Sequence, residues 1–343
     1  MVYIGVDLHR KVSQLAGLDA SGELVFERRI PTAPAEFCRV FGELGAEPIE
    51  VAFEATYGWG WFADLLADVG IPAHMAHPLA TKAISAGRVK NDAVDARTLA
   101  HLLRTNLLPE ACIAPPEVRA ARHLVRMRAA LVRIRSRLKA QVHALCAERG
   151  VAIPVSDLFG RGGRELLAGL ALPALPANRL AAHLRLIDAL GAEITEAERE
   201  IVRLFGDDPR IERLTPIPGI GFLTAATVVA EVWDVSRFPR PERLTSWAGL
   251  TPSERSSADH TRRGHITKQG SRWLRWVLIE AATHVRDPGL RRFAAPIERR
   301  RGTKIARVAL ARRLLTLAYY ALRDPAGCRT YPILHRRSVT ARS

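Results

Sequence analysis

Four carboxylates in the first hundred residues restrict what this chain can fold into and do. Asp7 and Glu54 each end a short apolar run that is typical of a buried strand. Asp92 and Asp95 are three residues apart, so a helix there would carry both on one face. A carboxylate at the end of a buried strand is costly unless a cation compensates it. If the four side chains meet, divalent cations such as Mg²⁺, which prefer oxygen ligands, are the usual way to offset their repulsion.

The charge balance of the chain indicates a polyanionic partner. Lysine and arginine total 51 against 35 acidic residues, which gives a formal net charge of +16. Nucleic acid is the first candidate, and two Mg²⁺ ions side by side stabilise both the attacking and the leaving oxygen of a phosphodiester displacement. A membrane is a less suitable partner, because no apolar run in the sequence is as long as the stretch of about 20 residues that a membrane-spanning helix needs. We therefore predict a cytoplasmic, metal-dependent nucleic-acid enzyme with no signal peptide and with reduced cysteines.

Residues 1–110 are predicted to form an α/β domain. Three strand-like segments come first, and helix-like and strand-like segments then alternate. The predicted strands are residues 2–8, 12–19, 24–30, the segment that ends at Glu54, and 71–76, and the predicted helices are 34–44, 59–69 and the one that carries Asp92 and Asp95. This order is the one expected of a ribonuclease-H-like domain, but many other α/β domains begin the same way.

Residues 111–206 are predicted to be a helical linker region with a coiled coil. After Pro115-Pro116, apolar residues recur at alternating spacings of three and four, which is typical of a coiled-coil seam. The seam consists of Leu124, Met127, Leu131, Ile134, Leu138, Gln141 and Leu145. Similar spacing recurs in a second predicted helix, at Leu190, Ile194, Ala197, Ile201 and Leu204. The two helices could pair within one chain or between two chains.

The flanks of the first predicted helix are strongly basic. Arg126, Arg133 and Arg137 belong to a run of cations with almost no acid between them. Because like charges this close repel one another, we predict that the phosphate backbone of a nucleic acid lies against them. The alternative is a solvated helix face.

Residues 207–325 are predicted to be a helical C-terminal domain, and residues 326–343 a basic tail. Gly219 and Gly221 belong to a Pro-Gly-Ile-Gly turn that runs directly into an apolar helix at 223–232. A glycine turn at a helix N-terminus presents backbone N–H groups to a phosphate. The segment therefore resembles a helix-hairpin-helix element, with both glycines as candidate nucleic-acid contacts. The alternative is an ordinary tight turn.

A polar stretch at residues 251–270 is predicted to be a functional loop between helices. Two predicted helices follow it, at 272–285 and 304–322. The candidate hydroxyls and cations of the loop and of the helix after it are Arg255, Ser256, Ser257, Lys268, Arg272 and Arg275. The alternative is a solvent-exposed linker.

Short motifs that run through nearly the whole chain, to about Leu322, carry a family resemblance. In order they are Gly5-Val6-Asp7, Phe53-Glu54-Ala55-Thr56, Lys90-Asn91-Asp92-Ala93-Val94-Asp95-Ala96, Ile217-Pro218-Gly219-Ile220-Gly221, Ala248-Gly249-Leu250-Thr251-Pro252, Gly264-His265-Ile266-Thr267-Lys268-Gln269-Gly270 and Trp273-Leu274-Arg275. The chain resembles the DEDD insertion-sequence transposases of the IS110 family. The resemblance implies a ribonuclease-H-like domain similar to Holliday-junction resolvases, then a coiled coil, then a C-terminal transposase domain.

The same resemblance implies the roles of the candidate site residues. It makes Asp7, Glu54, Asp92 and Asp95 a metal-binding tetrad for Mg²⁺, with two ions expected. It also makes a serine of the C-terminal loop the nucleophile that attacks DNA. Members of the family carry Ser-Gly five residues beyond a proline that matches Pro252. That count gives Ser257 as the nucleophile. In this chain the next residue is Ala258 where the family has glycine, and the adjacent Ser256 is the alternative nucleophile.

The resemblance further implies the reaction and its partners. Ser257 would attack the scissile phosphate and form a covalent phosphoserine–DNA intermediate. For this reaction we predict that Arg255, Lys268, Arg272 and Arg275 are the candidates to neutralise the charge that develops on the phosphate. A structured noncoding RNA would guide the enzyme to DNA, and a dimer or tetramer associated with the nucleoid is expected. The alternative function is a junction endonuclease that activates water at the metal site, with a C-terminal domain that only binds DNA. A third reading is a non-enzymatic scaffold that binds nucleic-acid backbone.

Overall fold

The computed structural model describes residues 1–56, 58–84, 92–257 and 260–324, although the side chains of 255–263 lie outside the described part. The chain divides into two compact units, Met1–Glu117 and Val118–Ser343. The predicted basic tail and the motif residues Lys90 and Asn91 lie outside the described residues. Among the helices that are described, none combines the length and the apolar character needed to cross a membrane.

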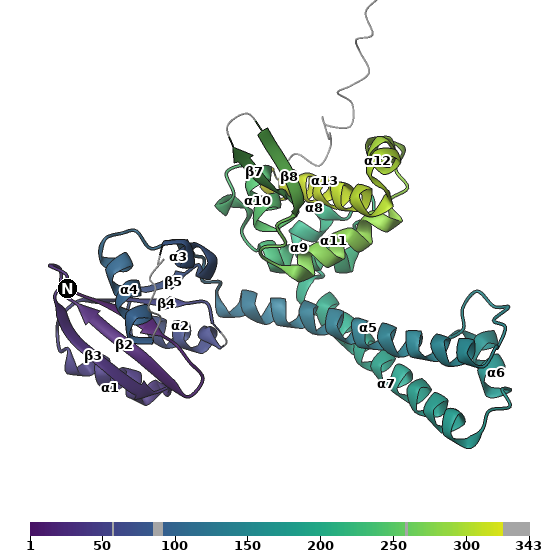
Figure 1. Cartoon of the computed structure of the whole chain (residues 1–343), viewed down its shortest axis with the longest axis horizontal. Helices are drawn as coiled ribbons and strands as arrows, with labels where there is room; N and C mark the ends of the chain where they lie inside the picture. Colours follow the sequence, from purple (N-terminus) through teal and green to yellow (C-terminus); the bar gives the residue numbers. More distant parts are fainter. Residues whose placement is uncertain (57, 85–91, 258–259, 325–343) are drawn as a thin grey trace, which may run out of the picture. The chain divides into compact units, whose positions relative to one another are not determined.

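The N-terminal unit is built on a six-stranded sheet in the order β3-β2-β1-β4-β5-β6 (Figure 1). Strands β1 and β4 pair in parallel, as do β4 and β5, whereas β2, β3 and β6 are antiparallel to their neighbours. The strands are β1 (Val2–Asp7), β2 (Val12–Leu18), β3 (Leu24–Pro31), β4 (Ile49–Glu54), β5 (Ala73–Ala76) and β6 (Glu110–Ala111). This mixed sheet is consistent with the predicted ribonuclease-H-like domain.

Helices cover both faces of this sheet. Side chains alternate between the faces of a strand, so Ile4 and Val6 of β1 pack with helices α1 (Pro34–Glu43) and α2 (Trp59–Asp68). Helix α4 (Asp92–Arg104) packs on the opposite face, where Leu99 and Leu103 contact Tyr3 and Ala52. A short helix that the sequence did not predict, α3 (Pro78–Ile84), follows β5.

Two long helices form the central part of the chain (Figure 1). Helix α5 spans Pro116–Glu148 and α7 spans Ala174–Phe205, with the short helix α6 (Arg161–Ala168) between them. At one end Val142 and Leu145 of α5 pack with Leu180 and Ile187 of α7 and with the α6 segment. At the other end both helices join the core of the C-terminal unit. The two helices therefore contact each other within one chain.

The buried face of α5 differs from the predicted seam. Met127 and Ile134 are 47% and 48% exposed, whereas Val125, Ala129 and Val142 are buried. The prediction is wrong for these two seam residues because they lie away from the face of α5 that packs against α7 and the C-terminal core. A coiled coil through the exposed residues stays a prediction.

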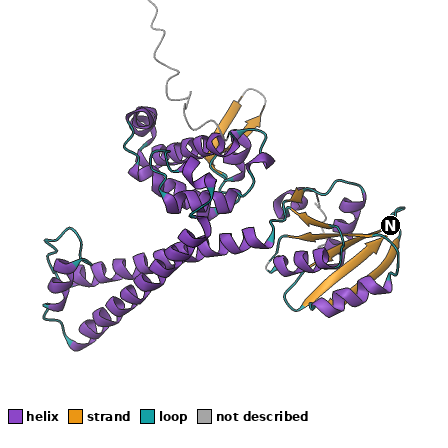
Figure 2. Ribbon diagram, turned by 180° about the vertical axis from the view of Figure 1, so that it is seen from behind, coloured by secondary structure: helices purple, strands orange, loops and turns teal. Residues whose placement is uncertain are grey.

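Beyond α7, the described part of the C-terminal unit is helical and contains a β-hairpin (Figure 2). Its elements are α8 (Pro209–Leu214), α9 (Phe222–Val232), the 3₁₀ turn η1 (Val235–Arg237), α10 (Pro241–Trp247), β7 (Pro252–Ser257), β8 (His260–Ile266), α11 (Arg272–His284), α12 (Pro288–Arg301) and α13 (Thr303–Arg323). Helix α13 lies in the core, where the buried Tyr319 donates its hydroxyl proton to the carbonyl of Phe238 at 3.0 Å. The prediction of a loop at 251–270 is wrong, because most of this stretch pairs as β7 and β8.

Candidate functional site

Strand pairing places Asp7 and Glu54 at the same edge of the sheet. Val6 lies opposite Phe53 in the parallel pair of β1 and β4, so the next residue of each strand is acidic. By alternation, Asp7 shares a face with Tyr3, and Glu54 shares one with Ala52. Tyr3 and Ala52 both contact α4. The two strand-end carboxylates therefore project on the side of the sheet that α4 covers.

Gly5 allows α4 to lie directly on β1. A Cβ atom at this position would come within 2.6 Å of the backbone nitrogen of Ala100 and closer still to the carbonyl oxygen of Ala96. Only a residue without a side chain permits this approach. Because Asp92 and Asp95 form the first turn of the same helix, the close packing brings their carboxylates to Asp7.

We expect Gly5→Ala to destabilise the N-terminal unit by about 3 kcal/mol or more, because the clash is with backbone atoms that cannot rotate away. The change should lower the melting temperature. Gly42→Ala is the matched control, since a Cβ there meets nothing within 4 Å. In helix α1 it should be neutral or stabilise by up to about 1 kcal/mol. Equal melting temperatures for the two variants would contradict the close approach of α4.

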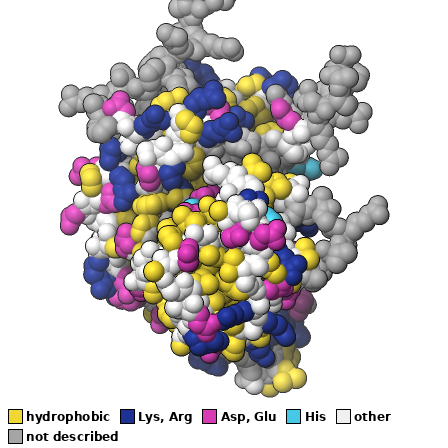
Figure 3. All heavy atoms as spheres, turned by 90° about the vertical axis from the view of Figure 1, so that its left-hand side faces the viewer, with side chains coloured by type: hydrophobic (Ala, Val, Ile, Leu, Met, Phe, Trp, Pro, Cys, Tyr) yellow, Lys and Arg dark blue, Asp and Glu magenta, His cyan; other side chains and the backbone are white. Residues whose placement is uncertain are grey.

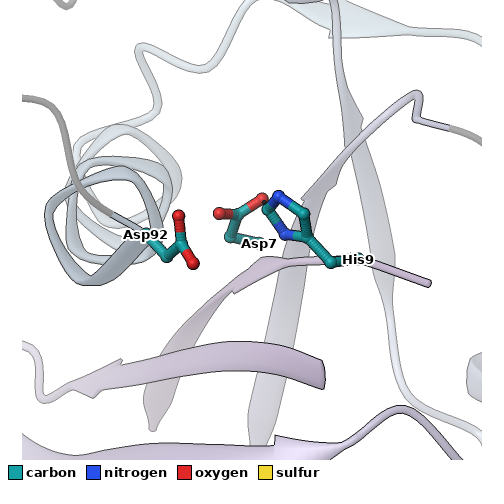
Figure 4. A group of neighbouring side chains, drawn as sticks. All are labelled: Asp7, His9 and Asp92. Atoms are coloured by element: carbon teal, nitrogen blue, oxygen red, sulfur yellow. Dashed lines mark ion pairs between the residues drawn. The ribbon is translucent and has the colours of Figure 1, made fainter. Parts of the chain in front are cut away.

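The structure brings Asp7, Asp92 and a histidine together. Single ligand atoms of Asp7, His9 and Asp92 all lie within 4.8 Å of one another. Figure 4 shows the carboxylates of Asp7 and Asp92 directed toward each other, with the ring of His9 beside Asp7. The His9 Nδ1 atom lies 3.3 Å from Oδ1 of Asp7. Sequence reasoning missed His9, and the available signal was its position two residues beyond a strand-end carboxylate.

The other three predicted acids act electrostatically on Asp7. Its residue surface is 9% exposed, and the pKa of its carboxyl is raised from 3.8 to about 6. Burial is the largest cause, the negative charges of Asp92, Asp95 and Glu54 act in the same direction, and His9 opposes them. Glu54 and Asp95 do not belong to the compact group of ligand atoms around Asp7, but they act on it electrostatically. Oxygen donors with excess negative charge and one imidazole fit a divalent cation.

A threonine joins the ends of the two strands that carry the site. The Thr56 hydroxyl donates to the carbonyl oxygen of Leu8 at 3.1 Å, and its backbone N–H donates to the carbonyl of Glu54 at 2.8 Å. These bonds connect the residues just beyond β1 and β4. They restrict how far Asp7 and Glu54 can separate, which favours a preformed site.

The predicted nucleic-acid contacts on α5 have different environments. Arg126 forms a two-pronged ion pair with Glu231, with N–O distances of 2.6 and 2.8 Å, and Glu231 is 1% exposed. Arg122 donates to the carbonyls of Ala230 and Glu231. Arg126 therefore has a structural role at the α5–α9 contact that sequence reasoning did not predict. By contrast, Arg133 and Arg137 are exposed, and no described carboxylate lies within ion-pair distance of either.

We expect Arg126→Ala to cost about 3–5 kcal/mol of stability, because it leaves the Glu231 carboxylate buried without its partner. Arg137→Ala is the matched control on the same helix. It should leave the melting temperature unchanged and reduce the slope of log K against log salt by about one for a nucleic-acid ligand. If Arg126→Ala weakens nucleic-acid binding but leaves the melting temperature unchanged, the structural role is contradicted.

The glycine turn before α9 packs against α11. Gly219 has a φ of +89°, and a Cβ there would lie 2.8 Å from a methyl group of Val285 and 2.9 Å from the carbonyl oxygen of Ala281. Gly221 is the N-cap of α9 with a φ of −87° and open space around it. The positive φ and the close approach therefore require glycine at position 219 only. The role of both glycines in nucleic-acid contact stays a prediction.

The β7–β8 hairpin is held at its base by backbone packing. Gly249 and Gly270 both have positive φ, and a side chain on either would meet the backbone of the other end of the hairpin segment. Arg275 donates to the carbonyls of Ala248, Gln269 and Gly270, and burial lowers its pKa. These bonds give Arg275 a structural role at the hairpin base, whereas the sequence predicted a nucleic-acid contact.

The predicted nucleophile lies at the far end of this hairpin. The backbone of Ser257 ends β7 and pairs with His260 of β8. The side chains of Arg255, Ser256 and Ser257 lie outside the described part of the chain. Lys268, at the hairpin base, is exposed and has a φ of +58°. The guanidinium of Arg272 lies 4.6 Å from the centre of the Trp273 ring.

Basic residues that sequence reasoning passed over are exposed on α12. Their signal in the sequence was a run of two arginines followed by a run of three. The residues are Arg291, Arg292, Arg299, Arg300 and Arg301. On the face of the molecule drawn in Figure 3, Lys and Arg side chains are interspersed with acidic ones. The charged side chains on that face are therefore mixed in sign and do not form a single basic block (Figure 3).

Comparison with known proteins agrees with this arrangement. The DEDD transposase family of IS110 elements matches residues 4–148, and the family described as "Transposase IS116/IS110/IS902 family" matches residues 211–295. A "Probable family 20 transposase" of Pseudomonas aeruginosa is 28% identical over 90% of this chain and 93% of its own length. The "Transposase for insertion sequence element IS1111A" of Coxiella burnetii is 27% identical over 90% and 86%. The chain therefore belongs to the IS116/IS110/IS902 family of transposases, and it is a DNA transposase/recombinase.

Proposed function

We propose that this transposase cuts and rejoins DNA by attack of Ser257, assisted by Mg²⁺ at the carboxylates of the N-terminal unit. The observation that carries the proposal is the position of Asp7. Burial and the charges of three other acids raise the pKa of its carboxyl, which lies next to Asp92 and His9. Such an arrangement is unfavourable for a metal-free protein and favourable for one that binds a divalent cation.

Asp7 and Asp92 would hold the cation directly, and Glu54 and Asp95 would complete the ligand set for a second ion. His9 already contacts Asp7 and would orient that carboxylate. When bound, Mg²⁺ polarises a phosphate oxygen and offsets the charge that develops in phosphodiester displacement. The protein contributes a fixed position for the carboxylates, which the Gly5 contact and the Thr56 hydrogen bonds maintain.

In the proposed reaction the Ser257 hydroxyl oxygen forms a bond to the scissile phosphorus. The bond from phosphorus to the 3′-oxygen of the neighbouring nucleotide breaks, and that oxygen leaves as a 3′-hydroxyl after taking up a proton. The serine loses its own proton to solvent or to a nearby base. The product is a DNA 5′-phosphate esterified to serine. Attack of another 3′-hydroxyl on this ester would rejoin DNA without an external energy source.

The exposed cations of the C-terminal unit support nucleic-acid binding in this proposal. Arg133 and Arg137 on α5 and the arginine groups of α12 are available for a phosphate backbone, whose affinity would depend strongly on salt. Arg255 is proposed to contact DNA near Ser257, and Lys268 and Arg272 are proposed to contact DNA at the base of the hairpin. A structured guide RNA would be bound through its backbone and shape. A homodimer or homotetramer that uses the exposed Met127 and Ile134 of α5 as a coiled-coil seam is part of the same proposal.

One observation favours the endonuclease alternative. Asp7, His9 and Asp92 all come from the N-terminal unit, so the carboxylate group does not depend on the hairpin for its assembly. Such a site could activate water by itself. Denaturing electrophoresis of a reaction with end-labelled DNA separates the two functions, because only the serine reaction leaves labelled DNA attached to the denatured protein. Cleavage without such a complex would support the water reaction.

A further inference from the structure

A cavity in the C-terminal unit has features that the proposed serine reaction does not use. It has a volume of about 260 Å³ and is lined by residues of α5, α7, α9, α11 and the glycine turn. Its walls include Trp273, Trp276, Glu280, His284, Thr224 and Gly219. Ligand pockets for drug-sized molecules begin at about 300 Å³. This cavity is therefore suited to a single small planar group.

The aromatic wall of the cavity comes from one helix face. Trp273 and Trp276 are three residues apart on α11, so they are neighbours on its surface. Buried residues of the same helix, among them Leu274 and Leu278, hold it against the core. Trp276 remains 37% exposed at the cavity. Two indoles on a rigid helix offer a flat, apolar surface on which another ring can stack.

Guanidinium groups surround the first of these indoles. The Arg272 guanidinium carbon lies 4.6 Å from the centre of the Trp273 ring, and that of Arg133 on α5 lies 5.8 Å from it. Both arginines are exposed, so their charges can also attract a phosphate. Proteins commonly bind single-stranded nucleic acid with cationic side chains that lie next to aromatic side chains on which the bases stack.

The polar groups of the cavity distinguish a base from a phosphate. Glu280 lines the wall, and its negative charge would repel a phosphate placed inside. The cation in the lining, Arg128, is already paired with Glu198 at 2.9 Å. A carboxylate, a hydroxyl and an imidazole match the donors and acceptors on the edge of a nucleobase. The neutral base therefore fits the interior, and the phosphodiester fits the arginines outside.

We propose that this cavity binds one unpaired nucleobase, stacked on Trp276, while the adjoining phosphodiester contacts Arg133 and Arg272 beside Trp273. The inference rests on the proposed nucleic-acid function but not on the serine reaction. The base could belong to unpaired RNA or to unpaired DNA, since both present the same ring chemistry. Perfect duplex would not use the cavity, because its bases are stacked and paired inside the helix.

The test measures binding of the full-length protein to short oligonucleotides that carry the fluorescent base 2-aminopurine at an unpaired position. Four probes are compared: single-stranded RNA, single-stranded DNA, a duplex with one bulged nucleotide and a perfect duplex. In the wild type, stacking on an indole should quench the fluorescence of the unpaired probes. Tighter binding of the RNA or of the DNA single strand identifies the source of the base.

Trp276→Ala should weaken binding of the unpaired probes by about tenfold, remove the quenching and leave the perfect duplex unaffected. Trp276→Phe, which keeps an aromatic ring, should retain most of the binding affinity for the unpaired probes and most of the fluorescence quenching. Phe293→Ala is the matched control, because Phe293 is 39% exposed in the same unit but does not line the cavity. Unchanged quenching in Trp276→Ala, or an equal loss for perfect duplex, would overturn the inference. That result would leave a Ser257–DNA complex intact, so the two proposals fail separately.

Discussion

Replacing Asp7 with asparagine is expected to abolish DNA strand cleavage and to make the metal-free protein more stable at neutral pH. Cleavage is lost because the amide is a weaker ligand for a divalent cation than the carboxylate. Stability rises because the amide removes a buried negative charge that faces Asp92, Asp95 and Glu54. Loss of activity combined with a gain of stability is the behaviour of a residue kept for function at a cost to the fold.

The pKa of Asp7 sets the pH range of this effect. Its folded-state pKa is about 6, above the ordinary value of 3.8, so the folded protein holds a proton that the unfolded chain releases between these values. The stability contributed by protonated Asp7 is therefore fully present below pH 3.8 and is lost as the pH rises through about 6. A shift of about two pKa units corresponds to at most about 3 kcal/mol. The gain in the free energy of unfolding from Asp7→Asn should therefore be near zero below pH 3.8 and constant at pH values well above about 6.

Thermal unfolding in a chelator, at several pH values from about 4 to about 8, measures this difference. Asp68→Asn is the matched control, because it removes the same charge from an exposed position at the end of α2. The Asp68→Asn variant should show no pH-dependent gain in melting temperature over the wild type. Added Mg²⁺ should stabilise the wild type by mass action but not Asp7→Asn. A variant that melts at or below the wild-type temperature at neutral pH would contradict the electrostatic account of Asp7.

Replacing Ser257 with alanine is expected to reduce cleavage by at least about 10³-fold, because no other group would supply the attacking oxygen. The melting temperature and any stabilisation by Mg²⁺ should stay as in the wild type, since the proposed metal ligands belong to the N-terminal unit. The measurement is the rate of strand cleavage on end-labelled DNA, resolved under denaturing conditions.

Ser256→Ala is the matched control for this prediction, because it makes the same chemical change one residue away in β7. It should retain most of the activity. Loss of cleavage in Ser256→Ala with activity kept in Ser257→Ala would move the nucleophile by one residue. Wild-type cleavage in both variants would favour activated water.

Much of the N-terminal unit was predictable because its pattern is strict. Asp7 and Glu54 end apolar runs, and parallel pairing of those runs places their ends side by side. The helical spacing of Asp92 and Asp95 placed both in the first turn of α4. What the sequence could not show was the contact that joins these elements. The requirement for glycine at position 5 becomes visible only when Ala96 and Ala100 lie against it.

The C-terminal unit was harder to predict because its chemistry is ambiguous in sequence. The hairpin of β7 and β8 was read as a loop, since its residues are polar and its described side chains are largely exposed, so no apolar alternation marks a strand. The sequence predicts nucleic-acid contacts at Arg126 and Arg275 because their partners in the fold are not visible in it. In a sequence, a cation that is paired with a distant residue cannot be told from one that is exposed. Glu231, the one charged residue of the largely apolar helix α9, was the available signal that a cation must pair with it.

The covalent complex between protein and DNA tests the account most directly. The full-length protein would be incubated with Mg²⁺ and end-labelled DNA, denatured and digested, and its peptides mapped by mass spectrometry. We expect a peptide in which Ser257 carries a DNA 5′-phosphate, present in the wild type and absent in Asp7→Asn. Cleaved DNA with free ends and unmodified Ser257 would contradict the account.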